Sequence, residues 1–408
     1  MNFEFFISRH IIKTGKGSLS RPPVRIAVIS VAVGTAVMIV SLAVLMGFQE
    51  EIREKVSAFN AHVQITAFDQ NVSYETRPIA PEKEYLEALS QNPYVKHLQP
   101  FATKAGIIRT KTDIQGVVFK GVDKIYDWTF FRDRLDEGRL PVIGDSTASK
   151  EVLASRKLAN MMQLKSGDEI RMYFVVEGEA QPRGRKFVIS GLYNTGLEEF
   201  DKMLVFGDLR HIRKLNGWAA NEVGGYELFI KDFTQIDQAG TSIYQSTPYD
   251  LNARTVKEVF PQIFDWLELQ DVNVIIIISL MILVSVMAVT SSLLILILER
   301  TSFIGVLKAM GTQNWALRKI FLHVSGYVIL KGMFWGNLIG LGICYLQSTY
   351  KIMALPQESY YMEYVPVSVH LGQVITLNVG SFIICTLVLI VPTMVISSIT
   401  PVKAIKYE

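Results

Sequence analysis

Apolar residues are distributed very unevenly along this chain, in long runs separated by segments of mixed polarity. Four segments are apolar over more than the roughly 20 residues that a helix needs to cross a bilayer core. They are Val24–Phe48, Val272–Leu298, Ile320–Leu346 and Leu371–Ile399. Lipid cannot satisfy backbone N–H and C=O groups, so such segments form helices. The pattern predicts an α-helical membrane protein with four transmembrane helices and a large polar block, residues 49–271, inserted between the first and second helices.

The block 49–271 mixes the alternation typical of strands with the three-to-four spacing typical of helices. Strands are predicted at His62–Phe68, Gly106–Thr110, Gly116–Val122, Glu169–Val176, Lys186–Tyr193 and Tyr226–Lys231. Helices are predicted at Glu82–Ser90, Ser155–Met162, Asp208–Leu215 and Asp232–Ser246. Strand–helix–strand order occurs at both ends of the block, whereas its middle is richer in strands and turns. We therefore predict an α+β domain with a β-rich insert at about 135–222.

The first apolar segment is predicted to be a retained anchor rather than a cleaved signal peptide. Its apolar core is too long for a signal peptide, and no small-residue cleavage site follows Phe48. Helical spacing continues past the membrane edge at Leu45, Phe48, Ile52, Val56 and Phe59. The helix is therefore predicted to continue as a stalk to about residue 60. Within residues 1–23, aromatic and aliphatic residues alternate with basic ones, which predicts an interfacial helix on the cytoplasmic leaflet.

The placement of basic residues predicts the orientation of the chain in the membrane. The first segment is preceded or opened by Arg9, Lys13, Lys16, Arg21 and Arg25. Residues 299–319 contain Arg300, Lys308, Arg318 and Lys319, and residues 400–408 contain Lys403 and Lys406. The loop 347–370 carries only Lys351. The positive-inside rule therefore predicts that both termini and residues 299–319 are cytoplasmic, with 49–271 and 347–370 on the opposite side.

Composition and motifs exclude several classes of function. The formal net charge of +3 gives no indication of a nucleic-acid partner. The sequence contains no H-E-x-x-H, G-x-S-x-G or C-x-x-C motif. Lys16 follows Thr14-Gly15 but lacks the upstream glycine of a phosphate-binding loop, and Cys344 and Cys385 fall within apolar segments, where they are expected to pack as small hydrophobic residues. We expect a protein that is not an enzyme and binds no metal or cofactor, so any ATP-driven work requires a partner.

Residues 299–319 are predicted to contain a short helix between the second and third spans. Phe303, Ile304, Leu307 and Met310 cluster on one side of a helical wheel over Glu299–Gly311. Gly311 suits the C-terminal end of this helix, and Thr312 suits the N-cap of the next. Physical reasoning favours equally an amphipathic connector on the headgroups and a helix that docks on a partner.

Several segments resemble FtsX-like ABC transporter permeases. Glu299–Gly311 is similar to the E-x-x-x-x-I-G-[IV]-L-K-A-[LM]-G stretch of that family, and Pro401–Glu408 resembles its P-x-x-A-[IL]-[KR]-Y-E terminus. Ser190–Asp201 resembles the S-G-x-[FY]-x-T-G-x-x-[EG]-[FY]-D segment of the lipoprotein-releasing branch, LolC and LolE. Phe264–Leu267 resembles that branch's entry to the second span. The resemblance covers nearly the whole chain.

The resemblance implies a permease subunit that extracts lipoproteins from the inner membrane and passes them to a periplasmic carrier. Its expected partners are two copies of a cytoplasmic ABC ATPase, a second permease subunit, the lipoprotein cargo and membrane lipid. The ATPase copies would bind ATP and Mg, and the second permease subunit would be either identical or different. The block 49–271 and the loop 347–370 would then be periplasmic. In the family, the short helix docks on the ATPase, which implies coupling roles here for Glu299, Arg300, Phe303, Ile304, Gly305, Leu307, Lys308 and Gly311.

Two further sites follow from the resemblance. A lipid cavity between the first and second spans has Leu45, Met46, Phe48, Ile52, Phe264 and Ile275 as candidate lining residues. The polar loop 175–186 occupies the position of a carrier-recruiting hook, with Gln181, Pro182, Arg183 and Arg185 as candidate contacts. An ordinary solvated loop is the alternative for the second site.

Other functions within the same superfamily stay open at this point. An FtsX-like regulator of a periplasmic cell-wall hydrolase usually has a much smaller extracytoplasmic domain, and a MacB-like efflux permease carries a fused ATPase domain. A membrane enzyme is disfavoured by the missing catalytic groups. The sequence does not show whether the permease pair is a homodimer or a heterodimer, or which cargo it prefers. Lys331, within the third apolar segment, is predicted to face the bundle interior or to snorkel, since an unpaired charge in lipid is costly.

Overall fold

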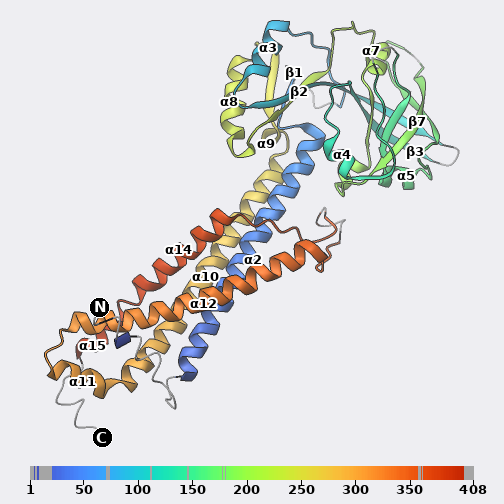
Figure 1. Cartoon of the computed structure of the whole chain (residues 1–408). Coiled ribbons are helices and arrows are strands. Elements are labelled where there is room, and N and C mark those ends of the chain that lie inside the picture. The colour runs from blue at the N-terminus through green and yellow to red at the C-terminus, as the bar shows by residue number, and fades with distance from the viewer. Residues whose placement is uncertain are drawn as a thin grey trace. The chain divides into compact units, whose positions relative to one another are not determined.

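The computed structural model of the chain forms two compact units (Figure 1). Unit 1 contains Met1–Glu50, Trp266–Ala354 and Tyr364–Glu408, and unit 2 contains Glu51–Asp265 and Leu355–Glu363. The structure describes residues 4, 7–8, 21–69, 74–110, 113–144, 147–176, 178–179, 181–356, 360 and 362–398. Most of the predicted interfacial helix at 1–23 and all of the predicted tail at 400–408 lie outside these residues.

Unit 1 is built from long apolar helices. They are α2 (Arg21–Asn60), α10 (Pro261–Glu299), α12 (Asn314–Tyr350) and α14 (Leu371–Val388). Each belongs to one of four segments, among the described residues, that are long and apolar enough to cross a membrane. α2 is unbroken to Asn60, so its last turns belong to unit 2, and α10 begins in unit 2. The four predicted spans are thus present as helices.

The fourth span differs from the single helix predicted over Leu371–Ile399. α14 ends at Val388, and after a turn the chain continues as the 3₁₀ helix η2 (Pro392–Met394) and the short helix α15 (Val395–Ser398). Pro392 lacks a backbone N–H, and a proline ring clashes with the carbonyl four residues earlier in an α-helix. The regular helix therefore ends before it.

Three glycines at four-residue intervals bring α12 directly against α2. A Cβ on Gly332 would lie 2.6 Å from the Cβ of Val31. On Gly336 it would lie 2.6 Å from the carbonyl oxygen of Ala32. On Gly340 it would lie 3.1 Å from the Cα of Ala36. Small residues allow membrane helices to approach backbone to backbone, and this glycine seam is such an interface.

Helix α11 (Thr301–Ala309) joins α10 to α12 and ends in a Schellman motif. The N–H of Thr312 donates to the carbonyl of Leu307 and the N–H of Gly311 to that of Lys308, both at 3.0 Å. Gly311 has a φ of +88°, which explains the glycine predicted at this end. The prediction of Thr312 as the N-cap of α12 is wrong, because that position belongs to Gln313, whose side chain makes no capping hydrogen bond.

Unit 2 contains a ten-stranded sheet within the described residues, with neighbouring strands in the order β10-β1-β9-β2-β3-β8-β5-β7-β4 and β6 paired with β2 and β7. Its strands are β1 (Val63–Ala67), β2 (Val95–Arg109), β3 (Ile114–Val122), β4 (Leu135–Gly138), β5 (Glu151–Ser155), β6 (Glu169–Phe174), β7 (Arg183–Tyr193), β8 (Leu204–Asp208), β9 (Gly225–Ile230) and β10 (Leu251–Thr255). The strands of the predicted insert are hydrogen-bonded into the same network as those from both ends of the block. A separate insert at about 135–222 stays a prediction.

Short helices complete unit 2. They are α3 (Lys83–Gln91), α4 (Thr129–Asp133), α5 (Arg156–Met161), α6 (Glu198–Asp201), α7 (Arg210–Asn216), η1 (Phe233–Gln235), α8 (Ile236–Ser246) and α9 (Val256–Val259). Each helix predicted in the block overlaps one of them. A cluster of buried side chains from the strands, α5 and α7 forms the core, in which Phe119 stacks on Phe187 with ring centroids 5.2 Å apart.

Candidate functional site

The C-terminal end of α2 is held in the core of unit 2. Phe59 is fully buried and stacks on Phe200, with ring centroids 4.8 Å apart, and its ring meets Phe131 edge-on at 5.6 Å. Such aromatic contacts add to the free energy gained by burying the rings. The helix that begins in the first candidate span therefore ends among buried aromatic rings, and we call Phe131 and Phe200 around Phe59 the aromatic socket.

The buried ion pair of Lys120 and Glu227 provides a hydrogen bond to a backbone carbonyl at the same end of α2. The ammonium of Lys120 donates to the carbonyl oxygen of Phe59 at 2.6 Å and to Oε1 of Glu227 at 2.5 Å. Glu227 also accepts hydrogen bonds from the side-chain amides of Gln99, at 2.9 Å, and Gln64, at 3.3 Å. A cation is favourable at a helix C-terminus, and a buried charge is tolerated only when it is paired and fully hydrogen-bonded. The pair thus fastens α2 to strands β3 and β9.

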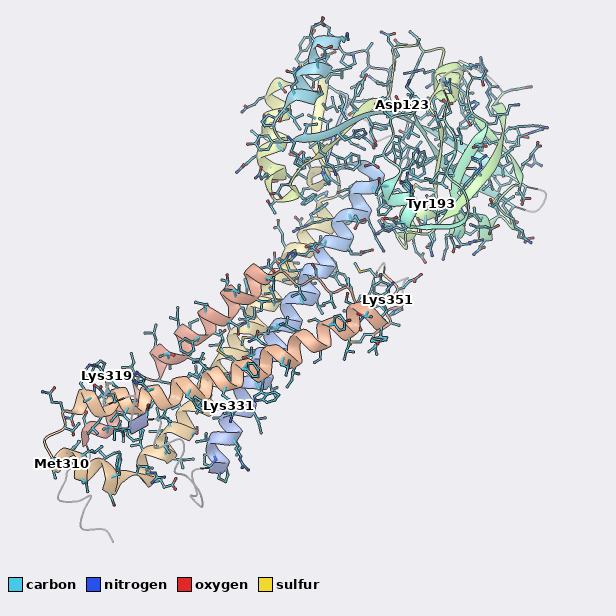
Figure 2. The ribbon with its side chains drawn as sticks, in the orientation of Figure 1. Asp123, Tyr193, Met310, Lys319, Lys331 and Lys351 are labelled. Atoms are coloured by element: carbon cyan, nitrogen blue, oxygen red, sulfur yellow. The ribbon has the colours of Figure 1, made fainter. Side chains whose placement is uncertain are left out.

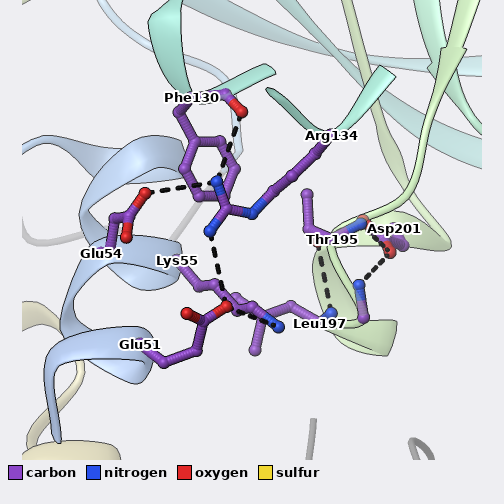
Figure 3. Close-up of polar contacts among 9 residues, drawn as sticks. Glu51, Glu54, Lys55, Phe130, Arg134, Thr195, Leu197 and Asp201 are labelled. Carbon is purple, nitrogen blue, oxygen red and sulfur yellow. Dashed lines mark hydrogen bonds and ion pairs between the residues drawn. The ribbon is translucent and has the colours of Figure 1, made fainter. Parts of the chain in front are cut away.

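The Ser190–Asp201 segment, which carries the lipoprotein-releasing resemblance, contributes Phe200 to the aromatic socket, and Figure 3 shows its turn at Thr195 and Asp201. The carboxylate of Asp201 accepts hydrogen bonds from the Thr195 hydroxyl at 2.7 Å, from the Thr195 N–H at 3.2 Å and from the Gly196 N–H at 3.1 Å. Burial raises the pKa of Asp201, while these three hydrogen bonds favour its charged form. The closed turn places Phe200 against Phe59. The threonine, glycine and aspartate of the motif are thus explained as the frame of a turn.

Arg134 joins the same end of α2 to α4 (Figure 3). Its guanidinium lies 3.2 Å from Glu54 and 3.4 Å from Glu51, and 4.0 Å above the centre of the Phe130 ring. These contacts are partly exposed, so breaking them should cost less stability than breaking the buried Lys120–Glu227 pair.

The predicted lipid-cavity residues divide into two groups. Leu45, Ile52 and Phe264 are buried within the chain, and their role in a lipid cavity stays a prediction. Met46 and Phe48 are half-buried, and Ile275 is 61% exposed. Ile275 belongs to an exposed apolar surface, the α10 face, which we define as Ile275, Ile276, Leu280, Leu283, Val284 and Met287. Sequence hydropathy alone does not distinguish this face from the buried residues of α2.

Helix α11 presents a different surface from the predicted one. Ile304, Gly305 and Leu307 are buried within the same unit, and the coupling roles predicted for them stay predictions. The exposed apolar side chains are Phe303, Val306 and Met310, the last 69% exposed, and we call them the α11 face. Spacing assigned Phe303 and Met310 to the same side as Ile304 and Leu307, whereas the helix divides them between solvent and core.

The charged residues of the predicted coupling segment bind within the chain. The Lys308 ammonium donates to the carbonyl oxygens of Ile396 at 2.7 Å and Ser397 at 3.4 Å, at the end of α15. Arg318 donates to the hydroxyl of Ser397 at 2.5 Å. Desolvation and the neighbouring Arg318 charge lower the pKa of Lys308. Lys308 thus connects α11 to the last described helix, and Glu299 and Arg300 lie at the junction of α10 and α11.

The predicted carrier loop is a connection between β6 and β7. Gln181 and Pro182 are exposed, whereas Arg183 and Arg185 belong to β7 and are half-buried. The guanidinium of Arg183 donates through Nε to Glu179 at 2.7 Å. The two arginines are therefore part of the strand, and Gln181 and Pro182 are the loop residues of the predicted set.

Two further expectations concern titratable groups. The side chain of Lys331 is exposed along α12 (Figure 2), so its predicted placement in the bundle interior is wrong, while snorkelling stays a prediction. Among the described residues no group of three or more His, Cys, Asp or Glu side chains is placed to hold a metal ion. Both cysteines are free and buried.

Comparison with known proteins relates these features to a family. Residues 26–265 match the family described as MacB-like periplasmic core domain, and residues 275–401 match FtsX-like permease C-terminal. The chain is 20% identical over 406 residues to the lipoprotein-releasing system transmembrane protein LolC of Xylella fastidiosa (strain 9a5c), covering 94% of this chain and 93% of that protein. It is 21% identical over 430 residues to LolE of Haemophilus influenzae, covering 99% of each.

A solved structure, the periplasmic region of MacB from Actinobacillus actinomycetemcomitans, is 13% identical with a TM-score of 0.35 and covers 53% of this chain and 97% of its own. The MacB-like match extends over more than half of the sequence. The chain therefore belongs to the family of ABC transporter permeases that combine a MacB-like periplasmic core domain with an FtsX-like C-terminal permease domain.

Proposed function

We propose that this chain is the transmembrane permease subunit of an ABC transporter that extracts lipoproteins from the inner membrane and passes them to a periplasmic carrier. The observation that carries the proposal is the α10 face, whose six apolar side chains are each about half exposed. Removing the acyl chains of a lipoprotein from a bilayer costs roughly 0.8 kcal/mol per methylene group, so extraction needs an apolar receiving surface. Relatives named LolC and LolE match nearly the full length of the chain.

The orientation in the membrane is part of the proposal. Family membership and the four candidate spans make the chain a multi-pass inner-membrane protein. The basic residues beside the spans favour cytoplasmic termini and a cytoplasmic α11, with unit 2 in the periplasm. The α11 face is then on the side where a soluble ATPase can reach it.

The energy source proposed is a separate ATPase that docks on the α11 face. Phe303, Val306 and Met310 are exposed on a helix whose opposite side is fixed in the core of unit 1 by Ile304 and Leu307. A partner that pushes on this helix moves the spans packed behind it. The permease itself would bind no nucleotide and perform no catalysis, and ATP and Mg would be bound by two ATPase copies.

The proposed assembly contains a second permease subunit. The α10 face is unpartnered within the described chain, and two such faces would enclose an apolar space for acyl chains. The carrier is proposed to contact the β6–β7 connection, where Gln181 and Pro182 are exposed.

The test is co-purification followed by measurement of lipoprotein-stimulated ATP hydrolysis. The tagged chain should purify with an ATPase and bound lipoprotein. Met310→Asp, which places a charge on the α11 face, should reduce ATPase recovery at least about tenfold, whereas Tyr249→Asp, at a 97% exposed position in unit 2, should not.

The alternatives predict other results. Recovery of a cell-wall hydrolase would indicate an FtsX-like regulator, and export of small molecules without lipoprotein would indicate a MacB-like efflux permease. Wild-type ATPase recovery and stimulation in the Met310→Asp variant would contradict docking on α11.

A further inference from the structure

Unit 2 contains a cavity of about 440 Å³ that none of the functions above uses. Its floor is one face of the sheet, formed by β10, β1, β2 and β3, and its walls include the end of α2, residues 199–204 around α6, the end of α9 and Tyr74–Arg77. All of these segments belong to unit 2. Its volume lies in the range of roughly 300–1,000 Å³ that small ligands occupy.

The floor presents hydrogen-bonding side chains at neighbouring positions. Thr66 of β1 lies opposite Asn252 of β10, and Gln64 lies opposite Arg254, in register. Within the described residues, the side chains of Thr66, Asn252 and Arg254 make no hydrogen bond or ion pair. A carboxamide can donate and accept at once, which matches the donor and acceptor of a peptide group.

A buried donor beside the same cavity also lacks a partner. The side-chain nitrogen of Asn60, at the end of α2, has no hydrogen-bond partner in the structure, while its oxygen accepts from Gln64 at 3.5 Å. This nitrogen is itself covered by the protein, so Asn60 shapes the end of the cavity, and the accessible polar groups are those of the floor.

Another part of the lining is apolar. It is formed by Phe200, Met203, Val259 and Phe260, and Phe200 and Phe260 meet edge-on with ring centroids 5.7 Å apart. A ligand that fills the cavity therefore meets both hydrogen-bonding and apolar groups, and an extended peptide with one apolar side chain can match both.

The charges that line the cavity cancel. It has three basic residues, Arg77, Lys120 and Arg254, and three acidic residues, Asp69, Glu75 and Glu199. Most are engaged in pairs, since Arg77 lies 2.9 Å from Asp69, Glu75 lies 3.3 Å from Lys104, and Lys120 is paired with Glu227. A strongly charged ligand such as a phosphate would lack a matching set of free charges, so the lining favours an uncharged one.

The wall formed by Tyr74–Arg77 is fixed to the sheet. The N–H of Thr76 donates to the carbonyl of Thr103 at 3.2 Å, and the N–H of Thr103 donates to the Thr76 hydroxyl at 3.1 Å. This reciprocal pair holds the segment over β2, so the cavity exists before any ligand enters, which lowers the entropic cost of binding.

We propose that this cavity binds an extended, uncharged peptide segment, with its backbone on Thr66 and Asn252 and one apolar side chain against Phe200 and Met203. The identification of that segment as the peptide portion of a lipoprotein cargo rests on the proposed function. Unit 2 thereby recognises the protein part of the cargo, separately from the acyl chains that the α10 face would receive.

The test measures peptide binding to the full-length protein in detergent by fluorescence anisotropy. The probe is a labelled, non-lipidated hexapeptide of glycine, serine, asparagine and one leucine. Wild type should bind it saturably, and Asn252→Leu and Thr66→Val should each weaken binding by about tenfold, as expected for one lost hydrogen bond to a buried group. Asn221→Leu removes an exposed carboxamide outside the cavity and should bind as wild type.

Competition and release assays separate the possible failures. Unlabelled hexapeptide should compete, whereas inorganic phosphate and a free fatty acid should not, and displacement by the fatty acid alone would overturn the proposal in favour of an acyl-chain site. Absence of saturable binding, or unchanged binding in both Asn252→Leu and Thr66→Val, would also overturn it. Lipoprotein release by the same wild-type preparation with its ATPase is measured in parallel, and lack of release would contradict the proposed function, whatever the peptide result.

Discussion

Helices α2 and α10 are nearly equal in length and hydropathy but differ in how much of their apolar surface the chain covers. They contain 40 and 39 residues. In the most apolar stretch of each helix, 50% of the residues of α2 are buried, compared with 17% of those of α10. α2 carries small residues, Ala32, Thr35 and Ala36, where the glycine seam of α12 packs. The α10 face consists of branched and long side chains that the described chain leaves about half exposed. Helix α2 is thus packed largely within the chain, whereas α10 keeps an apolar surface that lipid or, in our proposal, cargo or a second subunit would cover.

The largest effect is expected from filling the glycine seam. Gly336→Leu should prevent the close contact of α12 with α2, because a Cβ there would already lie 2.6 Å from both Ala32 and Thr35. Overpacking usually costs about 1–3 kcal/mol, but here a whole leucine side chain meets backbone that cannot move aside, so the expected loss exceeds about 5 kcal/mol. The unfolding midpoint in detergent should fall by roughly ten degrees or more. Gly342→Leu, in the same helix with open space around it, is the control and should leave the midpoint unchanged.

The next effect concerns the socket at the end of α2. Lys120→Met should lower the free energy of unfolding by about 3–5 kcal/mol, because it leaves Glu227 buried without its counter-charge. Adding Glu227→Gln should recover most of the loss, since a carboxamide carries no charge. Lys186→Met, at an exposed pair 3.8 Å from Glu169, should change stability by less than about 1 kcal/mol. Equal losses at the two lysines would show that the buried pair does not fasten α2.

Part of this fold could be predicted from the sequence, and part of it could be seen only in the structure. The four spans and the strands with alternating burial could be predicted, because membrane thickness and the two-residue period act locally. Strands β5 and β8 were missed since nearly all of their residues are buried, which removes the alternation, and the short strands β4 and β10 were missed although their burial alternates. The glycine seam and Lys120–Glu227 were missed because each depends on residues distant in sequence. The sides of α11 were confused because apolar residues face both the core and the solvent, and spacing alone does not separate Met310 from Leu307.

The smallest expected effect is a pH dependence of the stability, caused by His62, which lies just after the end of α2. Burial lowers the pKa of His62 to about 4, and its Nδ1 accepts the N–H of Ile230 at 2.9 Å. Between pH 4 and the unfolded pKa of about 6.5, the unfolded chain binds a proton that the folded chain does not. Stability should therefore be complete above pH 6.5 and fall by up to about 3 kcal/mol as the pH drops to 4. Denaturant unfolding of wild type and His62→Gln across this range checks it, and parallel curves for the two proteins would remove His62 as the cause.

Photo-crosslinking of lipoprotein to the α10 face tests the central claim most directly. A benzophenone amino acid is placed at Leu283 of α10, and at two controls, Val379 of α14, which is similarly exposed at 52%, and buried Val31 of α2. With lipoprotein present and no ATP, irradiation should yield a lipoprotein adduct at Leu283, and irradiation after the ATPase partner has hydrolysed ATP with Mg should yield none. Val379 should yield only phospholipid adducts, and Val31 should yield none. Absence of the lipoprotein adduct at Leu283, or an equal yield at Val379, would contradict the assignment of α10 as the cargo-bearing surface.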